Sequence, residues 1–135
     1  MLRILLIDDD EAVRKATKIL LEAHGFDVAV AVDGQSGIEA IKAGSFDLAI
    51  VDLFMPGMDG LQTTKVIRQH NADIPIIATS GAGFGGLRPS APNFEVMALE
   101  AGANTTLYKP FRSRDLLKAI DDAREATLSE QPRRA

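Results

Sequence analysis

Five short apolar runs alternate along the chain with segments of helical periodicity, and this alternation constrains the fold more than any other feature. Three of the runs, at residues 4–7, 48–51 and 74–78, are continuously apolar, which is typical of strands whose two faces are both buried. Such strands favour a parallel sheet between two layers of helices. The predicted strands are residues 3–7, 27–31, 47–51, 75–79 and 104–108.

The segments between these runs carry apolar residues at helical spacing and predict five helices. In the first helix we expect Val13, Ala16, Leu20 and His24 to form the inner face. The (βα)5 pattern predicts a doubly wound, flavodoxin-like α/β fold, with a five-stranded parallel sheet in the order 2-1-3-4-5. The predicted helices are residues 11–24, 35–43, 60–70, 94–101 and 113–128.

Composition narrows the class of protein. The chain has 135 residues, which suits one domain, and we expect it over residues 1–128 with a short flexible tail at 129–135. The absence of cysteine excludes disulfides, thiolate catalysis and cysteine-ligated metal sites. A net charge of −4 and 5% aromatic residues argue against direct nucleic-acid binding. No apolar stretch approaches the roughly 18 residues of a membrane span, and we expect a cytoplasmic protein.

Polar side chains follow four of the five predicted strands. Three acids, Asp8, Asp9 and Asp10, follow the first strand, and Asp52 ends the third. The fourth strand ends in Thr79 and Ser80, and Lys109 follows the fifth. Ligands of an open parallel sheet bind beyond the carboxyl ends of its strands, so we expect these side chains to face one crevice.

The acids in this set predict a metal site. Asp10 is explained by capping of the following helix, which leaves Asp8 and Asp9 without that reason. Adjacent carboxylates repel, and Mg2+ relieves the repulsion because it takes oxygen ligands. A carboxylate beside such an ion can act as a nucleophile and form an aspartyl phosphate, which is the role we predict for Asp52. Lys109 would supply a cation for phosphate oxygens. Taken singly, Asp52 could also be a turn residue and Lys109 a solvated surface lysine. Their joint occurrence with the other polar residues at the strand ends favours a phosphoryl-transfer site.

Four motifs give the chain a family resemblance. They are ILLIDDD at residues 4–10, DLAIVDLFMPGMDG at 47–60, PIIATSG at 75–81 and KPF at 109–111. With these motifs in order, residues 2–128 resemble the receiver domain of bacterial two-component response regulators, of the stand-alone chemotaxis type.

The resemblance implies a role for each matching residue. Asp52 would accept a phosphoryl group from a histidine kinase or a phosphotransfer protein. Asp9, Asp52 and the backbone carbonyl of Phe54 would bind Mg2+ directly, and Asp8 would reach the ion through water. Ser80 would be the switch hydroxyl, and Lys109 would pair with the phosphoryl group.

The resemblance also implies local structure and partners. The Lys109–Pro110 bond is expected to be cis, and Asp59 is expected to cap the helix that begins at Gly60. The chain would switch the binding of a downstream protein, with the surface over residues 94–123 as the usual contact face. It would not be an enzyme beyond its own phosphorylation and dephosphorylation.

Two other functions fit parts of the pattern. An aspartyl-phosphate phosphatase of the haloacid-dehalogenase type would use Asp8 as its nucleophile and leave Asp52 without a role. A flavin- or nucleotide-binding module on the same fold would leave the acid cluster unexplained. Mapping the phosphorylated residue separates the first alternative from the receiver.

The chain departs from the family pattern at two places. The usual aromatic switch position holds Thr106, and whether Tyr108 replaces it is open. The loop over residues 81–93 is long, and its GAGFGG run is a chance match to the dinucleotide motif because prolines follow with no helix between. We hypothesise that Phe84 and Leu87 in this loop anchor a partner or cover the pocket. We also hypothesise that the apolar Phe54 slows loss of the phosphoryl group.

Overall fold

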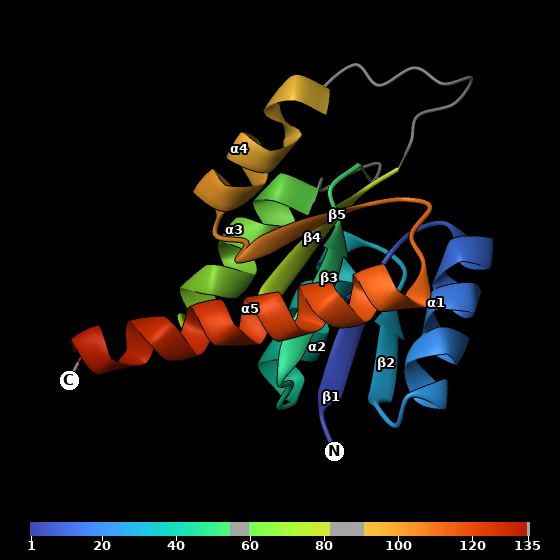
Figure 1. The fold of residues 1–135 in the computed structure, drawn as a ribbon, viewed down its shortest axis with the longest axis horizontal. Helices are drawn as coiled ribbons and strands as arrows, with labels where there is room; N and C mark the ends of the chain where they lie inside the picture. The colour runs from blue at the N-terminus through green and yellow to red at the C-terminus, as the bar shows by residue number, and fades with distance from the viewer. Residues whose placement is uncertain (55–59, 82–90, 135) are drawn as a thin grey trace.

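The computed structural model describes residues 1–54, 60–81 and 91–134 (Figure 1). Five strands alternate with five helices among them, as the periodicity predicts. The elements are β1 (Arg3–Ile7), α1 (Glu11–Ala23), β2 (Asp27–Ala31), α2 (Gly34–Ala43), β3 (Leu48–Asp52), α3 (Gly60–His70), β4 (Ile76–Ser80), α4 (Ala91–Ala101), β5 (Thr105–Tyr108) and α5 (Ser113–Arg134).

The strands form one parallel sheet in the order β2-β1-β3-β4-β5, which confirms the predicted doubly wound topology. At its carboxyl edge the sheet pairs Asp52 of β3 with Thr79 of β4, and Ser80 of β4 with Tyr108 of β5. Because all strands run the same way, the residues that follow β1, β3, β4 and β5 meet at one edge. This edge is where the candidate site lies.

Alternate residues along the strands point to opposite faces of the sheet and pack into two separate hydrophobic cores. On one face, Ile4 and Leu6 of β1 pack with Leu21 of α1 and Leu116 of α5. On the other face, Leu5 and Ile7 pack with the apolar residues of α2, α3 and α4, including Ile38, Ile67 and Phe94. Figure 1 shows α5 crossing one face of the sheet, with α2 and α3 on the other side of the sheet. Burial on both faces explains why the apolar runs of the three central strands, β1, β3 and β4, are continuous.

The inner face of α1 differs from the predicted one. Thr17 and Leu21 are buried, whereas the predicted Ala16 and His24 are exposed. Thr17 lies four residues from both Val13 and Leu21, so the inward stripe passes through a polar residue. The prediction placed only apolar residues on the inner face, and it therefore chose Ala16 instead of the neighbouring Thr17.

Helix α5 continues to Arg134, so residues 129–134 are helical where a flexible tail was expected. No glycine interrupts the chain over these residues, and Glu, Gln and Arg favour helix. Pro132 removes one backbone donor close to the helix end. Among the described residues, no helix combines the length and apolarity needed to cross a membrane.

Candidate functional site

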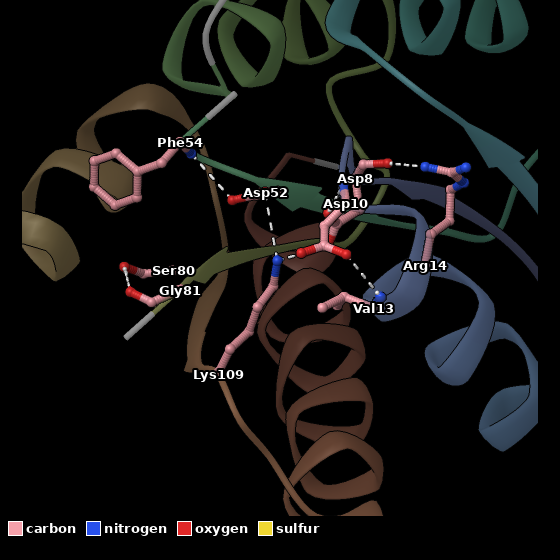
Figure 2. Close-up of polar contacts among 9 residues, drawn as sticks. All are labelled: Asp8, Asp10, Val13, Arg14, Asp52, Phe54, Ser80, Gly81 and Lys109. Carbon is pink, nitrogen blue, oxygen red and sulfur yellow. Dashed lines mark hydrogen bonds and ion pairs between the residues drawn. The ribbon is translucent and has the colours of Figure 1, made fainter. Parts of the chain in front are cut away.

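Two buried carboxylates and one lysine meet at the carboxyl edge of the sheet (Figure 2). Lys109 Nζ lies 2.6 Å from Asp8 Oδ2 and 3.4 Å from Asp52 Oδ2. The side chains of Lys109, Asp8 and Asp52 are 13%, 3% and 7% exposed. The structure therefore brings together three of the residues that sequence analysis placed at strand ends. The pairing of Asp8 with Lys109 was not predicted.

Backbone contacts hold Asp8 in this position. Its N–H donates to the Ala31 carbonyl at 3.1 Å, which continues the pairing of β1 with β2. Its Oδ1 accepts a hydrogen bond from the Asp10 N–H at 2.9 Å, and Arg14 Nη1 donates to its carbonyl oxygen. Asp10 itself caps α1 by accepting from the Val13 N–H, which confirms the predicted cap. The turn after β1 thus aims Asp8 inward and Asp10 at the helix.

The chain also fixes Lys109 and the start of α3. The Lys109–Pro110 bond is cis, as expected. The Lys109 N–H donates to the Ser80 carbonyl at 2.8 Å, which extends the pairing of β4 with β5 past the strand end. Gly60 begins α3 as predicted, whereas the expected cap Asp59 lies outside the described residues. Phe84 and Leu87 lie outside them as well.

Burial changes the acidity of Asp52. Loss of solvent raises the pKa of this carboxyl to about 6, against the opposing effect of the Lys109 ammonium. The Phe54 N–H donates to Asp52 Oδ1 at 3.1 Å and also favours the ionised form. The negative charge of Asp8 adds to the upward shift in pKa. Asp52 is therefore a carboxylate whose charge the protein compensates incompletely.

Asp9 completes a cluster of three acids. One carboxylate oxygen from each of Asp8, Asp9 and Asp52 can be chosen so that all lie within 4.8 Å of one another. Asp9 is exposed, and the other two are buried. Among the described residues, Lys109 forms ion pairs with two of these carboxylates, Asp8 and Asp52, so the cluster holds more negative than positive charge. Oxygen ligands and uncompensated charge suit a hard divalent cation.

Phe54 contacts this cluster through its N–H, and Ser80 lies at the end of the neighbouring strand, β4. Ser80 is buried at the end of β4, and its hydroxyl donates to the Gly81 carbonyl at 3.3 Å (Figure 2). Phe54 is half exposed, and its ring lies 6.4 Å from that of Phe94 on α4. Phe94 also contacts Tyr108. Neither ring contact of Phe94 was predicted, because the helical spacing of residues 94–101 gives no signal for it.

The response regulator receiver domain family matches residues 4–121. The chain belongs to this family. Its sequence is 36% identical over 118 residues to the transcriptional regulatory protein CseB of Streptomyces avermitilis, covering 87% of this chain and 46% of that protein. It is also 36% identical over 121 residues to CpxR of Escherichia coli, covering 89% of this chain and 48% of that protein. The receiver domain thus spans about half the length of these curated relatives.

Solved structures agree with the family. A CheY-like receiver domain protein from Methanospirillum hungatei superposes with a TM-score of 0.83 at 31% identity, covering 96% of this chain and 98% of that one. A receiver domain protein from Clostridium thermocellum gives a TM-score of 0.81 at 28% identity, covering 93% and 95%. The chain is therefore a receiver domain of two-component signalling, a module consistent with phosphoacceptor function. Membership does not favour the phosphatase alternative.

Proposed function

We propose that this receiver domain accepts a phosphoryl group on Asp52, from a histidine kinase or a phosphotransfer protein, and thereby changes its binding to a downstream protein. The observation that carries the proposal is the convergence of Asp8, Asp9, Asp52 and Lys109 at one edge of the sheet. Phosphoryl transfer needs positioning and charge stabilisation, and these side chains are suited to both.

The residues divide the work of the transfer. A carboxylate oxygen of Asp52 forms the new bond to phosphorus while the bond from phosphorus to the donor histidine nitrogen breaks, and the electron pair stays on that nitrogen. Lys109 Nζ lies near Asp52 Oδ2, where it can pair with the negative oxygens of the arriving group. Ser80 sits at the neighbouring strand end as the hydroxyl that would turn toward the phosphoryl group.

Mg2+ fits the acid cluster. Asp9, Asp52 and the backbone carbonyl of Phe54 would hold the ion, with Asp8 contributing through water. When bound, the ion neutralises the carboxylates and the charge that develops on the phosphoryl oxygens. In its absence, the excess negative charge beside Asp52 opposes the approach of an anionic donor.

The surface over residues 94–123 is the proposed contact face for the downstream protein. Val96 and Leu99 on α4 expose large apolar side chains there, at 56% and 54%. Exposed apolar side chains that cluster on one element are typical of an interaction surface.

Phosphorylation by a small acyl phosphate with Mg2+ tests the acceptor. Intact mass is expected to show one added phosphoryl group on the wild-type chain and none on Asp52→Asn. Labelling that persists in Asp52→Asn would contradict the assignment, and labelling mapped to Asp8 would support the phosphatase alternative instead.

The metal assignment has a matched pair of variants. Asp9→Asn removes a carboxylate of the cluster, so its labelling is expected to need a higher Mg2+ concentration. Asp10→Asn changes the adjacent acid, which caps α1 and lies outside the cluster, and asparagine caps helices as well as aspartate. Equal Mg2+ dependence in the two variants would contradict the role of Asp9.

A further inference from the structure

A cavity of about 460 Å³ lies at the amino edge of the sheet, opposite the edge that carries the candidate site. Its walls come from the end of α2, the turn into β3, the end of α3 and the turn into β4. In Figure 1 this is the edge at which β1 starts, beside the labelled N-terminus. Pockets that bind small molecules span about 300–1,000 Å³, so the cavity has room for a ligand.

One wall of the cavity is apolar. It is formed by Ile41 of α2, Phe46 before β3 and Ile74 before β4. Ile74 is buried, and the other two are partly buried against the same hydrophobic core. Because this wall belongs to the packed core, it is in place before any ligand arrives.

Two basic residues from different helices also line the cavity. Lys42 lies in the last turn of α2, and His70 is the last residue of α3. Within the described ranges, neither side chain takes part in a hydrogen bond or an ion pair. Among the described residues that line the cavity, none is acidic. An ammonium group and an imidazole N–H beside an apolar wall favour a ligand that carries a negative charge.

Acceptor groups in the turn between α3 and β4 are occupied. Helix ends expose carbonyl oxygens, which would oppose an anion. Here Arg68 Nη1 donates to the carbonyls of Ala72 and Ile74, at 2.9 and 2.7 Å. Asn71, which lines the cavity, accepts from the Ile74 N–H on its side-chain oxygen at 3.1 Å. These contacts leave the NH2 group of Asn71 as a third donor.

Arg3 adds positive charge beside the cavity. Its guanidinium lies 4.5 Å from the centroid of the Phe46 ring, and its Nη1 donates to the Ser45 carbonyl at 3.2 Å. Asp27 offsets part of this charge from 3.7 Å, but the pair is exposed and is therefore weakened by solvent. Positive charge thus comes to the cavity from β1 as well as from α2.

The position of the cavity selects the kind of anion. Phosphate groups are commonly bound by backbone N–H groups at a helix N-terminus, whereas this cavity lies where α2 and α3 end. A carboxylate carries a single negative charge, which the donors of Lys42, His70 and Asn71 can match. A flat aromatic ring suits the rest of the cavity, because it can pack against Phe46.

We propose that the cavity between the ends of α2 and α3 is a second binding site, which takes a small aromatic carboxylate. The carboxylate binds Lys42, His70 and Asn71, and the ring packs against the wall that contains Phe46. The site shares no residue with the acid cluster, and its occupancy does not require phosphorylation of Asp52.

The two histidines of the chain provide a reporter and its control. His70 lines the cavity, whereas His24 follows α1 and does not. The wild-type chain is titrated with benzoate while proton NMR follows the Hε1 resonances of both imidazoles, which His24→Gln assigns. We expect a saturable shift of the His70 resonance and an unchanged His24 resonance.

Two further compounds separate the contributions of charge and ring. Benzamide keeps the ring and loses the charge, whereas acetate keeps the charge and loses the ring. Each is expected to bind at least about 10-fold more weakly than benzoate, because each loses one of the two sets of contacts.

Lysine variants test the charged contact. Lys42→Gln should raise the Kd for benzoate by about 10-fold. Lys65→Gln, which replaces another exposed lysine on α3 outside the cavity, should leave the Kd unchanged. Asp52→Asn should bind benzoate as the wild type does, so failure of the proposed phosphoacceptor function would not affect this test.

Several outcomes would overturn the proposal. One is a His70 resonance that does not move up to the solubility limit of benzoate. Equal shifts of His70 and His24, or equal weakening in Lys42→Gln and Lys65→Gln, would indicate general attraction of an anion to basic side chains. Acetate that binds as tightly as benzoate would overturn the assignment of the ring to the apolar wall.

Discussion

Lys109 is the residue on which the electrostatics of the site depend. Its ammonium lies within ion-pair distance of Asp8 and Asp52, both of which are buried. A buried carboxylate without a partner is costly, since burial removes the water that would stabilise its charge. The exposed pair of Lys118 and Asp122 on α5 has a similar distance of 2.8 Å but remains solvated.

The two lysines are therefore expected to differ sharply in their contribution to stability. In metal-free buffer at pH 8, Lys109→Gln should lower the free energy of unfolding by roughly 3–5 kcal/mol, because it leaves two buried acids uncompensated. Lys118→Gln should change the free energy of unfolding little, because its ion pair is exposed to solvent. Urea unfolding of both variants measures the difference, and comparable losses would show that the site is more solvated than its burial indicates.

Asp52 gives the pH dependence of folding a definite sign. Its folded pKa of about 6 lies above its ordinary value, so between about pH 4 and 6 the folded chain holds a proton that the unfolded chain releases. Stability from this group is present below pH 4 and is lost as the pH rises through 6. With a chelator present, Asp52→Asn should exceed the wild type in unfolding free energy by about 2–3 kcal/mol at pH 7. Urea titrations at pH 4 and pH 7 should show a smaller difference in unfolding free energy between Asp52→Asn and the wild type at pH 4. A difference that stays constant would contradict a raised pKa of Asp52.

The pairing of the candidate site residues was less predictable than their positions at the strand ends. Asp8, Asp52 and Lys109 could be found because each follows an apolar strand, and parallel strands end at one edge. The ion pair of Asp8 with Lys109 joins residues 101 positions apart and depends on how each side chain turns, which no local pattern records.

At the scale of elements, α3 begins unusually close to β3. The Gly60 N–H donates to the Leu53 carbonyl at 3.1 Å, and a Cβ on Gly60 would overlap the backbone of Asp52 and Leu53. Gly37 of α2 is also crowded, but there the neighbour is the side chain of Ile7, which can adjust. The glycine at 60 thus permits the approach of a helix to the strand that carries Asp52, the proposed phosphoacceptor.

Replacing each of these two glycines with alanine should show that crowding against backbone atoms costs more stability than crowding against a side chain. Gly60→Ala is expected to displace the start of α3 from β3, to lower stability by about 2 kcal/mol or more, and to slow phosphorylation of Asp52. Gly37→Ala should cost less and leave the labelling rate unchanged, since only the Ile7 side chain has to move. Thermal unfolding and labelling kinetics test both, and a harmless Gly60→Ala would show that α3 is not held this close.

Arg68 shows what element-level patterns miss. From α3 its guanidinium donates to the carbonyls of Gly102 and Ile74 and to Asn104 Oδ1, which ties the ends of α3 and α4 to the start of β4. The sequence shows only an arginine on the polar side of a helix. Hydrophobic periodicity identifies the elements, whereas the hydrogen bonds between their ends depend on tertiary geometry.

At the scale of the whole molecule, the order of the sheet was predictable because the three central strands, β1, β3 and β4, are buried on both faces. That burial requires helices on both sides, and right-handed crossovers leave few ways to arrange five strands. The extent of α5 was less predictable, because Glu, Gln and Arg near a chain end are compatible with helix or tail. Sequence therefore specifies the layers better than it specifies where the last helix ends.

Metal binding should couple the candidate site to the stability of the whole domain. A cation bound by Asp9 and Asp52, with Asp8 contributing through water, would require strands β1 and β3 to be paired, so it would bind the folded chain and not the unfolded one. At tenfold excess over its Kd, Mg2+ should raise the free energy of unfolding by about 1.4 kcal/mol. Asp9→Asn should lose most of this gain, whereas Asp121→Asn, an exposed acid on α5, should keep it. Thermal unfolding across a Mg2+ series measures the effect at constant ionic strength. A gain that survives in Asp9→Asn would indicate general screening of an acidic surface instead of a site.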